Sequence, residues 1–65
     1  MNVRNATKAY ALAIVTYHYV EKAWRIKFTS PIAEKVPTVR WEERSNRRDA
    51  VACAMGDAVG VRFAY

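Results

Sequence analysis

The stretch WRIKF at residues 24–28 decides the fold, because it is the most regular alternation in the chain. Apolar side chains at positions 24, 26 and 28 alternate there with Arg25 and Lys27. Successive side chains of a β-strand point to opposite faces of the sheet, so the pattern predicts a strand with one buried and one exposed face. Arg25 and Lys27 are then expected to project together from the exposed face.

Two further segments show the same alternation and predict strands in the same sheet. In residues 38–44, Val39 and Trp41 alternate with charged residues, and in residues 61–65 an apolar parity alternates with Arg62. We expect the apolar parities to face the core. These predicted inward residues are Val39, Trp41, Val61, Phe63 and Tyr65.

Residues 10–20 predict the first strand, hairpinned to residues 24–28, because their second half is rich in β-branched and aromatic residues. The alternative is a helix from about Ala6, so the secondary structure of residues 6–15 stays open. Residues 1–5 are interpreted as a flexible lead-in. Both prolines fall in residues 29–37, which are therefore expected to form a loop.

A helix is predicted over residues 47–59. Ser45 and Asn46 are good N-caps, and Gly60 is placed to close the C-terminus. Its predicted inner stripe is Val51, Ala54, Met55 and Ala58, with Ala50 beside it. The element order is then β-β-β-α-β: an α+β fold with a small antiparallel sheet and one helix packed on one face. At 65 residues, we expect residues 1–65 to form a single small domain.

Composition favours a folded, non-membrane protein in a reducing compartment. The chain is 52% hydrophobic and 12% aromatic, which is not typical of disordered segments. Its longest uncharged run, residues 9–20, is shorter than the roughly 20 apolar residues of a spanning helix. The one cysteine cannot form an intramolecular disulfide. A cytoplasmic location is therefore expected.

Charge points to polyanionic partners. Eleven Lys and Arg against six Asp and Glu give a net charge of +5, and the pI is about 9.8, a strong positive field for so small a body. The strand alternation predicts that five of six charges on the open sheet face are basic. That predicted set is Arg25, Lys27, Arg40, Glu42, Arg44 and Arg62, joined by either Tyr17 and Tyr19 or Thr16 and His18. Such a face is suited to nucleic acid, since cations neutralise phosphates and rings stack on unpaired bases. The plainer interpretation is a solvated face whose charges keep the strands soluble.

A second cluster, Arg44, Arg47 and Arg48, surrounds the predicted helix N-terminus. The helix dipole disfavours cations there, whereas a bound phosphate would use both the free N–H groups and the guanidiniums. Exposed arginines offset by nearby acids are the alternative.

The sequence SNRRDA at residues 45–50, followed by Cys53 and Ala54, resembles the start of the last helix in double-stranded-RNA-binding domains. In that family a Ser precedes two adjacent basic residues, and small residues recur on the packing side. The resemblance covers only residues 45–54, and the family's first helix and glycine-rich lead-in have no counterpart in the pattern. Three strands and a helix are also similar to the arm-binding domains of phage-type integrases, without a diagnostic motif. The resemblance of residues 45–54 to double-stranded-RNA-binding domains implies phosphate contacts from Arg47 and Arg48.

No catalytic constellation can be assembled from these residues, so we expect a protein that is not an enzyme and carries no cofactor or metal. His18 is the single histidine, and Cys53 lies among small apolar residues of the predicted helix. No glycine-rich phosphate loop or paired-carboxylate spacing is present.

Two functions remain from different classes. The first is a small basic module that binds DNA or RNA through the open sheet face and the helix N-terminal arginines. The alternative is a phage-type inhibitor or adaptor that occludes a host complex, such as a CRISPR effector or RNA polymerase, by docking on an acidic surface. A homodimer that pairs the last strand, residues 61–65, with its copy is a further expectation.

Overall fold

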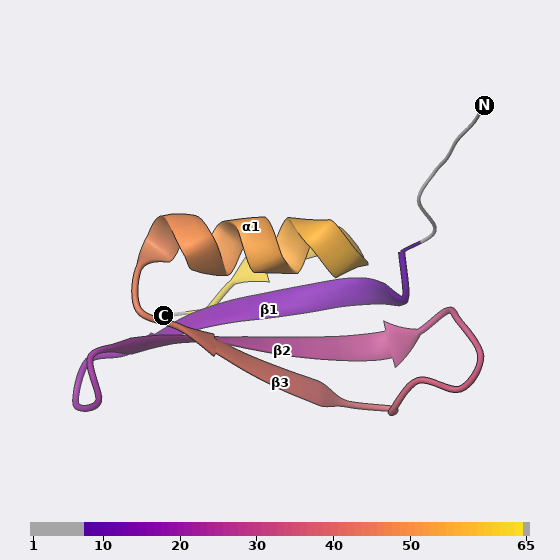
Figure 1. Cartoon of the computed structure of the whole chain (residues 1–65), viewed down its shortest axis with the longest axis horizontal. Coiled ribbons are helices and arrows are strands. Elements are labelled where there is room, and N and C mark those ends of the chain that lie inside the picture. The colour runs from indigo at the N-terminus through magenta and orange to yellow at the C-terminus, as the bar shows by residue number, and fades with distance from the viewer. Residues whose placement is uncertain (1–7, 65) are drawn as a thin grey trace.

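The computed structural model describes residues 8–64 and shows one helix on one face of a four-stranded sheet (Figure 1). The α+β class and the β-β-β-α-β order are confirmed. Residues 10–18 form a strand, so the helical alternative for that segment is wrong. Residues 1–5 and Tyr65 lie outside the described residues. The elements are β1 (Tyr10–His18), β2 (Ala23–Pro31), β3 (Arg40–Arg44), α1 (Arg47–Asp57) and β4 (Ala58–Phe63).

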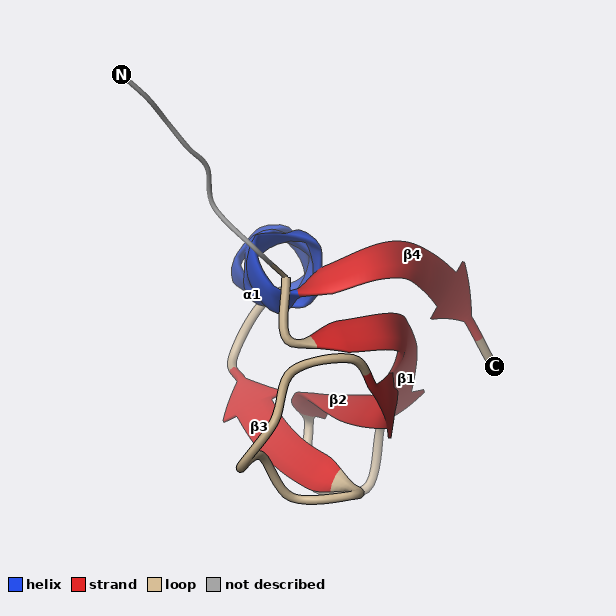
Figure 2. Ribbon diagram, turned by 90° about the vertical axis from the view of Figure 1, so that its right-hand side faces the viewer, coloured by secondary structure: helices blue, strands red, loops and turns tan. Residues whose placement is uncertain are grey.

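The strand order is β3-β2-β1-β4, and the sheet is mixed. β1, β2 and β3 are antiparallel as predicted, whereas β4 pairs parallel to β1. The chain leaves β3 at one edge, crosses the sheet through α1 and returns at the other edge (Figures 1 and 2). A helical crossover of this kind brings the chain back in the direction in which it left, which makes β4 parallel to β3 and to β1.

The prediction that the apolar side chains of residues 24–28 face the core is confirmed. Ile26 and Phe28 are fully buried, and Trp24 is half-buried against the core. Their partners across the strand pair are Val15 and Ala13, which are also fully buried. Directly paired residues share a face of the sheet, so β1 and β2 together present one apolar surface to α1.

Small residues bring α1 close to this surface. Ala50 and Ala54 are buried against the sheet, and Ala58, which follows directly in β4, is buried too. The predicted place of Met55 in the inner stripe is wrong, because its side chain is 56% exposed. Gly60 does not end the helix either: α1 ends at Asp57, and Gly60 lies in β4 opposite Leu12.

The prediction for the faces of the third strand is also wrong. Arg40 pairs with Phe28 and Glu42 pairs with Ile26, so these two charged residues share the face covered by α1. Trp41 pairs with Lys27 and lies on the open face. A shift of one residue in parity exchanges the two faces of a whole strand. At this sheet edge the inner positions accept charged residues because they have ion-pair partners there.

Tyr10 closes the core next to the loop that joins β2 and β3. Its ring lies 5.3 Å from that of Phe28, and its hydroxyl donates to the carbonyl of Pro37 at 2.8 Å. Ser30, near the end of β2, has a left-handed backbone with φ of 58°. Within residues 8–64, no helix has the length and hydrophobicity needed to cross a bilayer.

The close packing of α1 on the sheet leads to a prediction about stability. We expect Ala50→Leu to destabilise the protein by about 1–3 kcal/mol, because extra methylenes must be forced between helix and sheet. Ala52→Leu is the matched control, since Ala52 is exposed on the same helix and should change stability by less than about 0.5 kcal/mol. Urea denaturation followed by circular dichroism measures both, and equal stabilities would contradict the packing described.

Candidate nucleic-acid interface

The sheet face opposite α1 is uncovered by any element of residues 8–64, and is called the open face below (Figure 2). Pairing registers decide which side chains it carries, because every residue paired with an open-face residue is itself on that face. The open face comprises Leu12, Ile14, Thr16, His18, Ala23, Arg25, Lys27, Thr29, Trp41, Glu43, Gly60 and Arg62.

One row of this face crosses all four strands. Trp41 pairs with Lys27, Lys27 with Ile14, and Ile14 with Arg62. With neighbouring strands about 4.8 Å apart, the row is about 15 Å long. It therefore places an aromatic ring at one edge, a cation beside it and a second cation at the opposite edge.

Trp41 lies on the open face and not on the core face that the sequence alternation predicted. Its side chain is 58% exposed, and the Lys27 Nζ lies 5.7 Å from the centre of its ring. A signal for the correct face was present in the signs of the charges on the other parity of β3. Arg40, Glu42 and Arg44 alternate in sign, and neighbouring charges of opposite sign can be partly buried together because they form ion pairs with one another.

Three predicted cations do lie on the open face: Arg25, Lys27 and Arg62. Arg25 makes an ion pair with Glu21 at 3.8 Å, and both side chains are partly exposed. Among residues 8–64, Arg62 has no hydrogen bond or ion pair, and its side chain is exposed. These three charges are available to a ligand, because an exposed ion pair such as that of Arg25 contributes little stability.

Arg40 does not lie on the open face. Its Nη1 donates to Asp57 Oδ2 at 2.7 Å, and its Nε lies 3.2 Å from Glu42 Oε2. Its guanidinium also lies 4.3 Å from the centre of the Phe28 ring. These contacts join β3 to the end of α1 and to the core, so Arg40 is part of the packing between helix and sheet.

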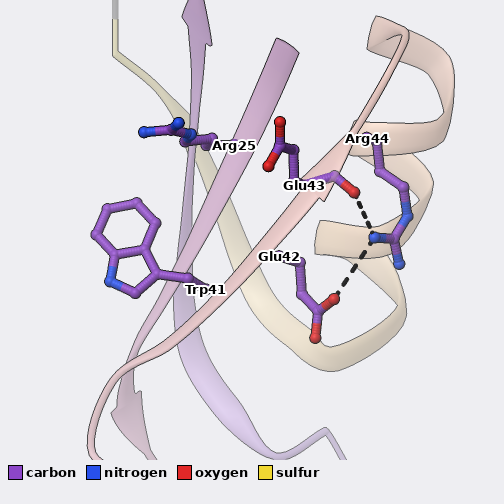
Figure 3. Close-up of a pocket in the computed structure, with 5 residues that line it drawn as sticks. All are labelled: Arg25, Trp41, Glu42, Glu43 and Arg44. Carbon is purple, nitrogen blue, oxygen red and sulfur yellow. Dashed lines mark hydrogen bonds and ion pairs between the residues drawn. The ribbon is translucent and has the colours of Figure 1, made fainter. Parts of the chain in front are cut away.

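Arg44 also turns away from the open face. Its Nη1 donates to the Glu43 carbonyl oxygen at 2.7 Å and lies 3.5 Å from Glu42 Oε1 (Figure 3). The two interactions hold the guanidinium on the helix side of β3.

The aromatic residues of the first hairpin are divided by the alternation. Tyr17 lies on the helix side, where its ring is 4.9 Å from that of Trp24. Tyr19 is 76% exposed in the turn after β1. Of the two alternatives for β1, the open face therefore carries Thr16 and His18.

At the N-terminus of α1, Arg47 and Arg48 are exposed, on the layer opposite the open face (Figure 2). The Arg47 guanidinium lies 5.3 Å from the centre of the Phe63 ring. The Asn46 side chain accepts from the Asp49 N–H at 2.9 Å and donates to the Asp49 carboxylate at 3.2 Å. A carboxylate thus already interacts with the positive end of the helix dipole. The structure places these arginines apart from Arg25, Lys27 and Arg62.

A shallow hollow of about 360 Å³ lies at the β3 edge of the sheet. It is lined by Arg25, Trp41, Glu42, Glu43 and Arg44. Figure 3 shows Arg25 and Trp41 on one side of β3, and Glu42 and Arg44 on the other. The residues that line the hollow therefore come from both faces of the edge strand, and one of them, Trp41, also belongs to the row across the open face.

In the described part of the chain, no three His, Cys, Asp or Glu side chains are close enough together to hold a metal ion. Comparison with protein-family models, curated proteins and solved structures found no match. The resemblance of residues 45–54 to double-stranded-RNA-binding domains therefore stays a prediction.

The different environments of Arg40 and Arg62 lead to a prediction about the free energy of unfolding. We expect Arg40→Ala to cost about 1.5–3 kcal/mol, because it removes a charged hydrogen bond and leaves the Asp57 carboxylate without that partner. Arg62→Ala, on the open face, should change stability by less than about 0.5 kcal/mol. Thermal and urea unfolding of the two variants measure this, and equal destabilisation would contradict the assignment.

Proposed function

We propose that this protein binds single-stranded nucleic acid, DNA or RNA, through the open face. The observation that carries the proposal is the row of Trp41, Lys27, Ile14 and Arg62 across the four strands. A base stacks on the exposed indole, and the cations along the row neutralise the phosphates of a strand that crosses the sheet. The net charge of +5 adds long-range attraction for such a ligand.

Several features favour unpaired strands over a duplex. The ring of Trp41 is open to solvent on the face of a sheet, and stacking on it needs a base that is not already stacked in a helix. Helices or two-stranded ribbons usually enter the grooves of duplexes, whereas flat sheets with exposed aromatic residues bind splayed single strands. The described open face offers no protruding element that would enter a groove.

The alternative function uses the same residues against a protein. Arg and Trp are the residue types that most often dominate binding energy at protein interfaces. A phage-type inhibitor would dock the open face on an acidic surface of a host complex. Nucleic-acid binding that is weak and equal for every strand type would favour this alternative, and a pull-down would then identify the partner.

Binding is expected to depend on Trp41. Because stacking contributes about 1–3 kcal/mol per base, Trp41→Ala should weaken binding to ten-nucleotide DNA and RNA strands about tenfold. Fluorescence anisotropy of labelled strands measures this. Binding should also quench the emission of wild-type tryptophan, and the quenching should disappear in the variant, where only Trp24 on the helix side remains. Undiminished affinity of the variant would contradict the proposal.

The cations of the open face should set the salt dependence. With Arg25, Lys27 and Arg62 on phosphates, log K should fall against log salt with a slope of about −2 on single strands. Lys27→Gln should reduce that slope. Lys35→Gln is the matched control, because Lys35 lies in the loop whose Val36 packs against the core on the helix side. Slopes that change equally in both variants would show only the effect of net charge and would contradict a defined site.

The helix arginines should contribute little to this binding. We expect Arg48→Gln to change the affinity for single strands by less than about twofold at 150 mM salt, because charges farther than about 8 Å from a ligand are largely screened. Anisotropy titrations of this variant beside Lys27→Gln compare the two layers. A larger loss from Arg48→Gln would instead favour a phosphate site at the N-terminus of α1.

A further inference from the structure

Glu43 is the one acidic side chain among the open-face residues. It pairs across the strands with Arg25, and yet the Arg25 guanidinium makes its ion pair with Glu21. In residues 8–64 the Glu43 carboxylate has no hydrogen bond or ion pair; only its backbone carbonyl accepts, from Arg44. A carboxylate repels phosphates even when it lies on a cationic face. The ligand group expected next to Glu43 is therefore one that donates hydrogen bonds.

The position of Glu43 relative to Trp41 fits one nucleobase. The two residues are two positions apart on the same face of β3, which separates them by about 7 Å along the strand. Both line the hollow of about 360 Å³ at the sheet edge (Figure 3). A base stacked on the Trp41 ring and extending along β3 therefore directs one of its edges at the Glu43 carboxylate.

The chemistry of a carboxylate discriminates among bases, because an ionised carboxylate only accepts hydrogen bonds. The Watson–Crick edge of guanine carries two adjacent donors, N1–H and the N2 amino group, which match the two oxygens. Adenine and cytosine each present one amino donor beside an acceptor nitrogen, and thymine or uracil presents one N–H between two carbonyls. Guanine is thus the one common base that binds a carboxylate through two parallel hydrogen bonds.

We propose that Trp41 and Glu43 form a subsite for an unpaired guanine, with Arg25 beside it to contact the adjoining phosphate. The proposal rests on the proposed function, since it names the base that the open face prefers. Trp41 supplies stacking energy for any base, and Glu43 supplies the preference among bases.

Labelled ten-nucleotide oligodeoxythymidines test the subsite, with one central position changed to guanine, inosine, adenine or cytosine. We expect the guanine strand to bind about tenfold more tightly than the all-thymidine strand, the lower part of the range for a two-bond contact to a base. Inosine lacks the N2 amino group and should bind with intermediate affinity. These measurements use the unmodified protein.

Glu43→Gln should remove the preference for guanine, because an amide presents one acceptor and one donor in place of two acceptors. Glu34→Gln is the matched control: it makes the same change of charge at an exposed position in the loop between β2 and β3 and should keep the preference. Comparing ratios of affinities between strands cancels the general gain that both variants have from losing a negative charge.

The outcomes separate the two proposals. Equal binding of all five strands to the unmodified protein, with affinity that depends on Trp41, would overturn the guanine subsite and leave the proposed function intact. A guanine preference that survives Glu43→Gln would also overturn the subsite. Absence of binding to every strand would overturn the proposed function and the subsite together.

Discussion

The guanidinium of Arg40 joins three parts of the molecule that are otherwise separate in sequence. It donates to Asp57 at the end of α1, lies 3.2 Å from the Glu42 carboxylate, and covers the Phe28 ring at 4.3 Å. Because the planar guanidinium is both a hydrogen-bond donor and a flat surface that stacks on aromatic rings, it covers an apolar core and satisfies a carboxylate at once. This contact fixes which face of β3 points toward α1. It thereby also fixes which residues of β3, Trp41 among them, lie on the open face.

The core that Arg40 covers is thin. Its large members are Tyr10, Val15, Ile26 and Phe28, and the helix above them contributes alanines. Alanine lets a helix lie close to a sheet, but it adds little apolar area, so the packing depends on the strands. A single helix can cover only one face of the four strands, which leaves the other face to solvent. The surface on which a function is proposed is thus the face of the sheet that the helix of residues 8–64 does not cover.

The arginines of this small protein fall into two groups according to the residues around them. Arg40 and Arg44 share Glu42 on the helix side of β3, whereas Arg25 and Arg62 lie with Lys27 on a face that contains one acid. The first pair joins β3 to the helix side of the fold, and the second group leaves positive charge on the open face. Glu43, without a partner in the described residues, departs from both patterns. Its place beside an exposed indole is the reason to expect recognition of a base as well as attraction of phosphates.

Local pattern by itself determined the inward face of residues 24–28 and the inward positions of Val61 and Phe63; it favoured the observed element order but left residues 6–15 open between strand and helix. It determined these faces because strand periodicity is a property of neighbouring residues, and in those segments only one parity is apolar. The faces of residues 40–44 were decided by tertiary structure. There both parities contain groups that can be buried, an indole on one side and mutually paired charges on the other, and the choice depended on Asp57 and Phe28, which are distant in sequence. The parallel pairing of β4 was decided in the same way, since the direction in which a chain returns depends on how its helix crosses the sheet.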